Sequence, residues 1–427
     1  MTVILPVSPT DATSSTPVNT ALEAALAPFL RPDAVQMRIG GYTVADAVRI
    51  AGGTPAYLYD RSVMQDRARR FRAEMPPALK LLYSIKANPH PVVAGLMAAE
   101  VDGFDVASGS ELQLAMGLAP SAARIQFSGP GKTRADVERA VAADVVINVE
   151  STAQLAMVAA TGAALGKTPR ICLRVNPSFL PGGAGLRMTG KPSQFGIFAD
   201  EVPALIAEAR ALGLDPMGLH FYWGTQLLNG ATIAEIQLRT WDCARNWIAE
   251  LGLNITHLNL GGGLGIPYFA GDGTVDTAPI AQSTQTIIRS FHHHAPQGDV
   301  FIELGRYLIG PAGVYVTTVL DVKRYGDETF VVTDGGMHHH LAATGNLGQG
   351  IHRPFPIVLA EKLDQPSVAK MVVTGCLCTP IDTFARGLPM PLVQIGDLMA
   401  ILQSGAYGAS ASPTGFLSHE PARELVL

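Results

Sequence analysis

Short apolar runs alternate with longer stretches of helical period between about Thr54 and Arg306. The runs with strand character are Ala56–Tyr59, Leu81–Lys86, Gly103–Ala107, Arg124–Ser128, Val145–Val149, Arg170–Val175, Gly218–Tyr222, His257–Leu260 and Val300–Glu303. Strands that alternate with helices indicate parallel βαβ units. Eight or so such units over about 250 residues fit a closed (β/α)8 TIM-like barrel. The alternative is an open doubly wound sheet, but the Gly-x-Gly-x-x-Gly turn typical of its first strand is missing.

The pattern changes after Arg306, where strand-like runs are separated by Gly- and Pro-rich loops without long helices. These runs are Val314–Lys323, Thr329–Thr333, Lys370–Thr374 and Leu398–Gln403. They predict a second, C-terminal, mainly β domain. We expect a disordered leader at residues 1–30, a barrel at 54–298, and a β domain assembled from 31–53 and 299–427.

Composition narrows the class of protein. A chain of 427 residues that is 48% hydrophobic is long enough for two domains with large cores. A net charge of -5 and a pI of about 6.1 give no electrostatic footprint for nucleic acid or an anionic membrane. Residues Met1–Thr20 lack the basic region of a signal peptide, and four cysteines do not make a disulfide framework at this length. A cytoplasmic location is therefore expected.

The run Leu81–Ile85 ends in a lysine, Lys86, and the strand pattern stops at Asn88-Pro89. A lysine at the end of a buried strand is desolvated, so its pKa is expected to fall. Its amine then becomes a nucleophile suited to Schiff-base chemistry with a carbonyl cofactor. The alternative is a lysine whose stem lies in the core while its ammonium reaches solvent.

Other polar residues also follow barrel strands. Asp105, His220–Tyr222, Gly261–Gly265 and Glu303–Arg306 occupy the same position as Lys86, at the carboxyl ends of predicted strands. Active sites of (β/α)8 barrels lie at that face. The shared position predicts one site built from these residues.

Two of these segments could bind charged groups of a ligand, one a phosphate and the other a protonated ring nitrogen. The backbone N–H groups of Gly261, Gly262 and Gly263 can cradle a phosphate, although a flexible turn is the alternative. Arg306 can add a charge-assisted bond to the same phosphate. Glu303 ends an apolar strand, and a buried carboxylate needs a partner. A pyridinium N–H would be one such partner, and a nearby arginine would be another.

Cysteine and histidine clusters suggest metals less strongly. Cys376 and Cys378 form a Cys-x-Cys pair, but no second ligand pair is spaced to complete a site. One of them is better interpreted as an acidic thiol near a carbanion, and Cys376 as a buried, inert residue. The triplets His292–His294 and His338–His340 place consecutive side chains in different directions, so they cannot all bind one ion. We expect no metal site; the first triplet should lie at a helix end and the second could line the cleft.

From about Gln36 to the C-terminus, these motifs together resemble the fold-type III pyridoxal-phosphate decarboxylases, which include diaminopimelate and ornithine decarboxylases. The resemblance implies an alanine racemase-like barrel, the cofactor pyridoxal 5'-phosphate, and a head-to-tail homodimer. It implies cofactor contacts from Lys86, Tyr222, Thr225, Gly261, Gly262, Gly263, Glu303, Gly305, Arg306 and Tyr407. It implies substrate contacts from Arg306, Thr379, Asp382 and Tyr407. The catalytic residues it implies are Lys86, which binds the cofactor covalently, and Cys378, which protonates the product carbanion from the partner subunit.

Three positions depart from the family pattern. Tyr222 replaces the histidine that usually stacks on the cofactor ring. Thr379 replaces the acidic residue that binds the distal amine of ornithine or diaminopimelate. Ala342 lies near the place of an arginine that diaminopimelate decarboxylases carry. Free cationic diamino acids therefore lose a charge partner.

The segments Met188–Gly196, Gly336–Ala343 and Cys378–Asp382 resemble a branch of this family found in exosortase-associated and secondary-metabolite loci. Some members of that branch act on amino acids tethered to carrier proteins. We therefore expect decarboxylation of an L-amino acid or a side-chain-conjugated amino acid. One alternative is diaminopimelate decarboxylase of lysine biosynthesis. Another is an amino acid racemase, although racemases of the alanine type place an arginine where this chain has Glu303. The third is a non-enzymatic cofactor-binding regulator, which would be barrel-only.

Overall fold

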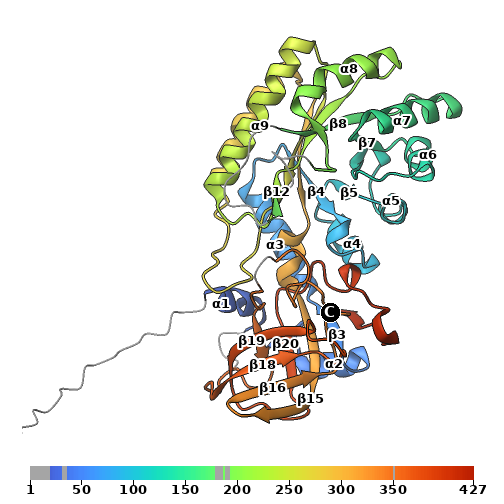
Figure 1. Ribbon diagram of the computed structural model, residues 1–427. Helices are drawn as coiled ribbons and strands as arrows, with labels where there is room; N and C mark the ends of the chain where they lie inside the picture. Colours follow the sequence, from blue (N-terminus) through green and yellow to red (C-terminus); the bar gives the residue numbers. More distant parts are fainter. Residues whose placement is uncertain (1–19, 31–35, 178–185, 188–192, 350–351) are drawn as a thin grey trace, which may run out of the picture.

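The computed structural model describes residues 20–30, 36–177, 186–187, 193–349 and 352–427. A barrel unit lies above a β domain in the view of Figure 1, and the C-terminus lies near the boundary between them. Part of the segment Met188–Gly196, on which one resemblance depends, lies outside the described residues.

Eight parallel strands form the barrel. They are β4 (Leu79–Ser84), β5 (Gly103–Val106), β6 (Ile125–Phe127), β7 (Val146–Val149), β8 (Ile171–Asn176), β11 (Gly218–Phe221), β13 (His257–Gly262) and β14 (Asp299–Leu304). Neighbours pair in the order β8-β11-β13-β14-β4-β5-β6-β7, and a further β7–β8 pairing closes the ring. The predicted closed barrel is confirmed. A short strand, β10 (Ile197–Phe198), adds to β8, and β9 (Leu186–Arg187) pairs with β12 (Gly224–Thr225).

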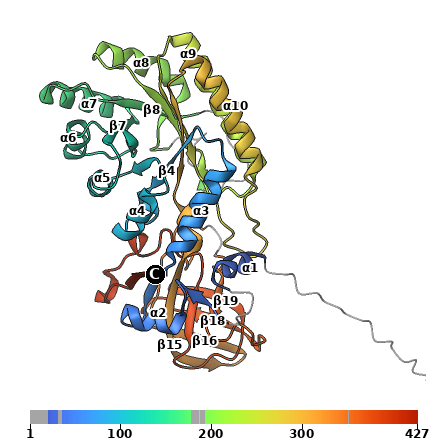
Figure 2. The ribbon, with the colours of Figure 1, turned by 180° about the vertical axis from the view of Figure 1, so that it is seen from behind.

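Helices cover the outside of the barrel, as Figures 1 and 2 show from opposite sides. They are α3 (Arg61–Glu74), α4 (Pro91–Ala98), α5 (Gly109–Met116), α6 (Arg134–Ala142), α7 (Thr152–Leu165), α8 (Val202–Ala211), α9 (Gly230–Leu251) and α10 (Ala278–His294). Their ends follow local chemistry: α7 begins after Ser151, whose side chain accepts from the Gln154 N–H, and ends at left-handed Gly166. The two longest, α9 and α10, pack through Trp241 and Phe291, whose rings meet edge to face.

The β domain is built around one long strand, β15 (Gly313–Tyr325). Its other strands are β3 (Ala56–Tyr59), β16 (Glu328–Thr333), β17 (Ile357–Leu359), β18 (Ala369–Thr374), β19 (Thr383–Met390), β20 (Leu398–Ile401) and β21 (Arg423–Val426). The first part of β15 pairs with β3 and β20, and its last part pairs with β16. Strand β21 pairs in parallel with β3, so the last strand of the chain lies beside the first strand of this domain.

The sheet pairings correct two expected domain boundaries. Strand β3 was expected in the barrel but pairs with β15 and β21 of the β domain. Strand β14 starts at Asp299, where the β domain was expected to begin, yet it pairs with barrel strands β13 and β4. An isolated apolar run of four residues suits either a barrel or a sandwich, and only pairing decides between them.

The described part of the expected leader, from Thr20 onward, is folded. Residues Thr20–Leu26 form α1 and Ala27–Phe29 a 3-10 turn, with Ala21, Ala25 and Phe29 buried. The remaining elements of this region are β1 (Arg38–Ile39), β2 (Tyr42–Thr43) and α2 (Val44–Ala51). Phe29 and Ile39 share a core with β3, which explains why this segment is ordered. Among the described residues, no helix is long and apolar enough to cross a membrane.

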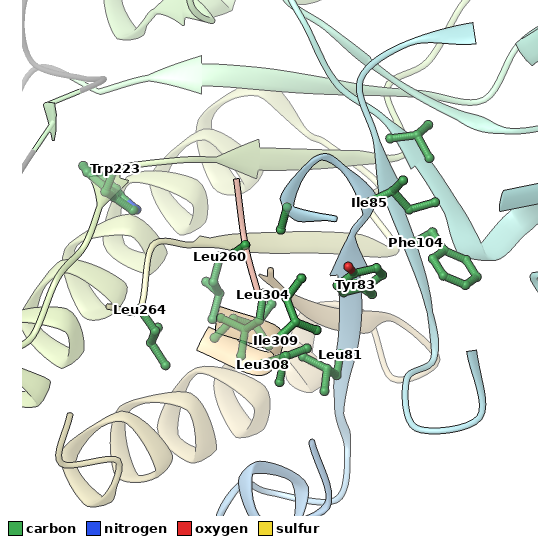
Figure 3. Packing of buried hydrophobic residues seen from close by; sticks show 14 of the residues in the cluster. Leu81, Tyr83, Ile85, Phe104, Trp223, Leu260, Leu264, Leu304, Leu308 and Ile309 are labelled. Atoms are coloured by element: carbon green, nitrogen blue, oxygen red, sulfur yellow. The ribbon is translucent and has the colours of Figure 1, made fainter. Parts of the chain in front are cut away.

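A buried apolar cluster fixes the strand ends that carry the polar residues. Figure 3 shows Leu81 of β4 beside Leu304 of β14 and beside Leu308 and Ile309 of the short helix α11 (Arg306–Ile309). All four side chains are at most 1% exposed. Each buried leucine or isoleucine contributes about 1.5–3 kcal/mol. The turns that hold Lys86 and Arg306 therefore start from rigid positions.

Candidate active site

One cavity of about 970 Å³ opens at the carboxyl ends of the barrel strands. Six of the predicted site residues line it: Lys86, Tyr222, Thr225, Glu303, Arg306 and Tyr407. The structure therefore brings these residues together at the face where they were expected. Its lining comes from both domains, since Tyr407 and Ala342 belong to the β domain.

Lys86 lies on a 3-10 turn directly after β4, and its Nζ is 2.7 Å from Oδ2 of Asp105 at the end of β5. The Asp105 carboxylate is fully buried, whereas the Lys86 side chain is 35% exposed, toward the cavity. Burial alone lowers the pKa of Lys86, but the carboxylates of Asp105 and Glu303 more than offset this and raise the pKa above its ordinary value. The expected fall in pKa is therefore wrong, because the sequence did not reveal that Asp105 contacts the amine.

Glu303, near the end of β14, contacts the side chains of an asparagine and a histidine. Its Oε1 accepts a hydrogen bond of 2.7 Å from Asn259 Nδ2 and lies 2.9 Å from His220 Nε2. Although burial favours the neutral acid, His220 and the cations of Lys86 and Arg174 lower the pKa of Glu303 to about 2. Glu303 thus stays ionised at one wall of the cavity. Its partner is a histidine rather than the arginine that we considered as an alternative.

Arg306 follows Gly305 at the start of α11 and meets two tyrosines. Its Nη1 donates to the Tyr268 hydroxyl at 2.8 Å, and its guanidinium carbon lies 4.6 Å from the centre of the Tyr407 ring. Tyr407 is held in turn by a 2.8 Å bond from its N–H to the Ala87 carbonyl. This bond joins the β domain directly to the turn that carries Lys86.

The glycine-rich segment lies behind the cavity wall. None of Gly261, Gly262 or Gly263 is among the described residues that line the cavity. A Cβ on Gly262 would lie 1.8 Å from the Glu303 carbonyl oxygen, and one on Gly263 would lie 2.2 Å from the Gly224 carbonyl oxygen. Gly263 also has φ +93°, a backbone conformation that favours glycine. These glycines allow close packing of β13 against β14 and β12, and phosphate binding by their N–H groups stays a prediction.

Tyr222 and Thr225 complete the inner wall. The Tyr222 ring lies 5.8 Å from Lys86 Nζ, and burial raises the pKa of its hydroxyl to about 12. It therefore presents a neutral aromatic surface to the cavity. Gly305 packs tightly against the lysine turn, since a Cβ there would lie 2.6 Å from the Ala87 Cβ.

The predicted residues of the β-domain loop do not line this cavity within one chain. Cys378 is exposed and Thr379 is half-buried, and neither is among the lining residues that the structure describes. Asp382 is 1% exposed, and its two carboxylate oxygens accept hydrogen bonds from the N–H groups of Met337 and Leu377. This placement argues against the expected substrate contact for Asp382, whose carboxylate instead orders the loop that carries Cys378.

Several lining residues were not predicted. Arg174, two residues before the end of β8, lies 3.0 Å from buried Glu150 and 5.8 Å from the Tyr222 ring. His220 was noted at a strand end but given no role, although it contacts Glu303. A search for polar residues near the carboxyl end of every predicted barrel strand would have found Arg174, because this arginine interrupts the apolar run Ile171–Val175.

An aromatic ladder connects Arg306 with the cavity mouth. The Tyr268 ring lies 4.2 Å from that of Phe355, which lies 6.2 Å from Phe269. The exposed Arg353 guanidinium stacks 3.9 Å from the centre of the Phe269 ring. This wall is apolar along its length and cationic at its outer end.

The residues around the cavity fit pyridoxal phosphate. A lysine amine, an ionised carboxylate, an aromatic face, an arginine and a threonine line one cavity. These groups match a carbonyl, a pyridine nitrogen, a planar ring and, for the last two, a phosphate. A closed parallel barrel with this site and a β domain defines the class of pyridoxal-phosphate enzymes with the alanine racemase-like fold.

Comparison with known proteins defines the family. The family model described as pyridoxal-dependent decarboxylase, pyridoxal binding domain, matches residues 61–310. The chain is 37% identical over 379 residues to the L-glutamyl-[BtrI acyl-carrier protein] decarboxylase of Niallia circulans, covering 87% of this chain and 88% of that protein. It is 30% identical over 363 residues to the diaminopimelate decarboxylase of Aquifex aeolicus, covering 84% and 83%.

A solved structure agrees with these relatives. The crystal structure of diaminopimelate decarboxylase from Helicobacter pylori complexed with L-lysine matches with a TM-score of 0.79 and 28% identity, covering 88% of this chain and 91% of that one. The chain belongs to the pyridoxal-dependent decarboxylases. It is a carboxy-lyase that uses pyridoxal phosphate to decarboxylate an amino acid, which confirms the expected cofactor, reaction and enzyme class.

Proposed function

We propose that the substrate is an L-amino acid whose side chain ends in a neutral or conjugated group, and that it is presented on a carrier protein. The observation that carries this proposal is the charge of the cavity lining. Lys86, Arg174, Arg306 and Arg353 are cations, and Glu303 is the one carboxylate among the described lining residues. Glu303 is already engaged by His220 and Asn259.

A free diamino acid fits this lining poorly. Its distal ammonium would lie along the ladder of Tyr268, Phe355 and Phe269 and would meet Arg353 at the mouth. Like charges in a partly enclosed site repel, and an ammonium loses hydration without gaining an anionic partner. An acylated or amide-linked side chain has no such charge and can extend along the apolar wall to solvent. The carrier-linked substrate in the name of the Niallia circulans relative agrees with this chemistry.

The roles of the inner residues follow from their positions. Bound pyridoxal phosphate supplies an electron sink for the electrons left when carbon dioxide departs. Lys86 would hold the cofactor covalently, and Asp105 would orient the lysine amine through their 2.7 Å contact. Glu303, kept ionised by His220, would hold a proton on the pyridine nitrogen. Arg306 and Thr225 would bind the phosphate, and Tyr222 would cover one face of the ring.

Cys378 is assigned to a shared site in a homodimer. Its thiol is exposed and lies outside the cavity of its own chain. Asp382 fixes its loop through two backbone N–H groups, so Cys378 is presented on a rigid segment. We propose that this loop enters the cavity of a partner subunit, where Cys378 protonates the product carbon and Thr379 contacts the substrate. The cytoplasmic location also stays a prediction.

The proposal is tested by carbon dioxide release from the enzyme saturated with pyridoxal phosphate. Free glutamate, meso-diaminopimelate, lysine and ornithine are compared with their side-chain conjugates. These are amides of the distal amines, and carrier-protein thioesters of the distal carboxyl groups of glutamate and meso-diaminopimelate. We expect kcat/KM for the preferred conjugate to exceed that for its free parent by at least a hundredfold. Efficient turnover of free meso-diaminopimelate would instead make the chain a lysine-pathway enzyme and refute the charge argument.

Arg353 gives a sharper version of the test. The variant Arg353→Glu places an acid at the outer end of the ladder and should raise kcat/KM for free diamino acids relative to the wild type. The control Arg289→Glu makes the same charge change at an exposed position of α10 and should leave substrate preference unaltered. Equal preference in both variants would show that charge at the cavity mouth does not select the substrate.

A further inference from the structure

The β domain brings together three metal-ligating side chains that are far apart in the sequence. The ligand atoms of His338, Cys376 and His419 all lie within 4.8 Å of one another. We propose that these three residues bind a transition-metal ion, Zn²⁺ by the chemistry of the set, at a site separate from the pyridoxal-phosphate cavity. None of the three is among the described residues that line that cavity.

His338 carries the strongest signal. Its side chain is 0% exposed, and neither ring nitrogen has a hydrogen-bond partner among the described residues. A buried imidazole without a partner is costly, and such groups usually satisfy themselves with protein, water or a metal ion. The His338 ring lies 4.8 Å from that of His419. Its unpaired nitrogens and its two neighbours together define a place for a cation.

The other two histidines of the triplet are already occupied. His339 contacts the Tyr315 hydroxyl through Nδ1 at 3.3 Å and the Glu420 carbonyl oxygen through Nε2 at 2.8 Å. His340 contacts the Ser404 hydroxyl through Nε2 at 3.0 Å. Only His338 is therefore available, as expected when consecutive side chains point in different directions.

Sheet topology explains why the ligands converge. Strands β16 and β18 run parallel, with Val332 paired to Thr374, so the loops that follow them leave the same sheet edge. His338 lies in the first loop and Cys376 in the second. The segment before β21 adds His419, and its neighbour Glu420 is tied to His339. The Cys-x-Cys spacing could not predict this site, because each ligand comes from a different segment.

The donor set fits Zn²⁺ with one open position. Two imidazoles and one thiolate are common zinc ligands, with bonds of about 2.0–2.1 Å to nitrogen and 2.3 Å to sulfur. Tetrahedral angles then separate the ligand atoms by roughly 3.3–3.6 Å, so binding requires them to approach by at most about 1.5 Å. His419 is exposed and can make most of this movement. Binding forms a sulfur–metal bond and releases the Cys376 thiol proton to solvent.

The ion would clamp the loop that carries Cys378. It would join the segments around His338 and His419 to Cys376, two residues from Cys378. Its removal should loosen this part of the β domain while the barrel stays intact.

The test uses holoenzyme freed of unbound cofactor, with Zn²⁺ or Co²⁺ alone as the added ligand. We expect one zinc per chain by elemental mass spectrometry after dialysis, and a higher thermal midpoint with Zn²⁺ than with chelator. Co²⁺ should give a thiolate-to-metal charge-transfer absorption. Cys376→Ser should abolish this absorption, and His338→Gln and His419→Ala should weaken binding by at least tenfold.

Matched controls separate the site from adventitious binding. Cys378→Ser and His293→Ala should retain one ion per chain with unchanged affinity, because neither residue belongs to the cluster. His419 is exposed, so His419→Ala should keep the fold even if the buried variants do not. Absence of stoichiometric metal in the wild type, or unchanged affinity in His419→Ala and Cys376→Ser, would overturn the proposal.

Discussion

Replacement of Asp105 by asparagine should make Lys86 a better nucleophile at neutral pH. The wild-type carboxylate lies 2.7 Å from Lys86 Nζ and raises the pKa of the amine, whereas burial alone would lower it. Asparagine keeps the shape and an oxygen acceptor but removes the charge. The amine should then lose its proton at a lower pH.

The magnitude follows from this distance. Two unit charges 2.7 Å apart attract by about 6 kcal/mol at an effective dielectric constant of 20, and by about 1.5 kcal/mol if water screens them fully. The Lys86 side chain is 35% exposed, so the true value lies between these limits. At about 1.4 kcal/mol per pH unit, the midpoint should move downward by roughly one to four pH units.

The assay measures capture of pyridoxal phosphate by enzyme stripped of cofactor. Its rate is followed by stopped-flow absorbance as a function of pH, and borohydride reduction with peptide mass spectrometry verifies that Lys86 is modified. Ser84→Ala serves as the control, since it removes a 3.1 Å hydrogen bond to Asp105 without changing charge. Its midpoint should stay close to that of the wild type. A midpoint in Asp105→Asn equal to or above the wild-type value would refute the electrostatic argument.

Three further predictions concern stability and assembly. The pKa of Glu303 is lowered to about 2 from an ordinary 4.5, so its ionisation should contribute about 3 kcal/mol of stability above pH 4.5. This contribution should be lost as pH falls toward 2. Urea unfolding of Glu303→Gln should lack this pH dependence. Gly263→Ala would place a Cβ 2.2 Å from a carbonyl oxygen and should lower the free energy of unfolding by at least about 2 kcal/mol. The control Gly271→Ala has a similar positive φ but open space around the new Cβ, so it should cost about 1 kcal/mol. Equal losses measured by calorimetry would contradict the packing argument. The variants Lys86→Ala and Cys378→Ala should each be inactive alone. If active sites are shared between subunits, a mixture of the two variants should recover about a quarter of wild-type carbon dioxide release. No recovery would argue for unshared sites.

Local sequence patterns predicted much of the barrel and its site. Apolar strand runs separated by helical periods fixed eight parallel strands, because period and length are local properties. The position of Lys86, Glu303 and Arg306 after such runs was enough to place them at one face, since parallel strands share their carboxyl edge. The same reasoning missed Arg174 only because it was not applied to every strand.

Pairing between distant segments could not be predicted in the same way. Strand β3 has the apolar pattern of a barrel strand, yet its partners are β15 and β21, more than 250 residues along the chain. The helix at Thr20–Leu26 is ordered by a core formed with the β domain. In both cases a buried surface supplied by remote residues decided the outcome.

The sequence by itself determined the class of chemistry: a strand-end lysine, a strand-end carboxylate and an arginine that together suit pyridoxal phosphate. Only the tertiary structure decided the ionisation of these groups and the convergence of His338, Cys376 and His419. The physical reason is range. Hydrophobic period and turn chemistry act over a few residues, whereas the pKa of Lys86 depends on Asp105, nineteen residues away in the chain and 2.7 Å away in space.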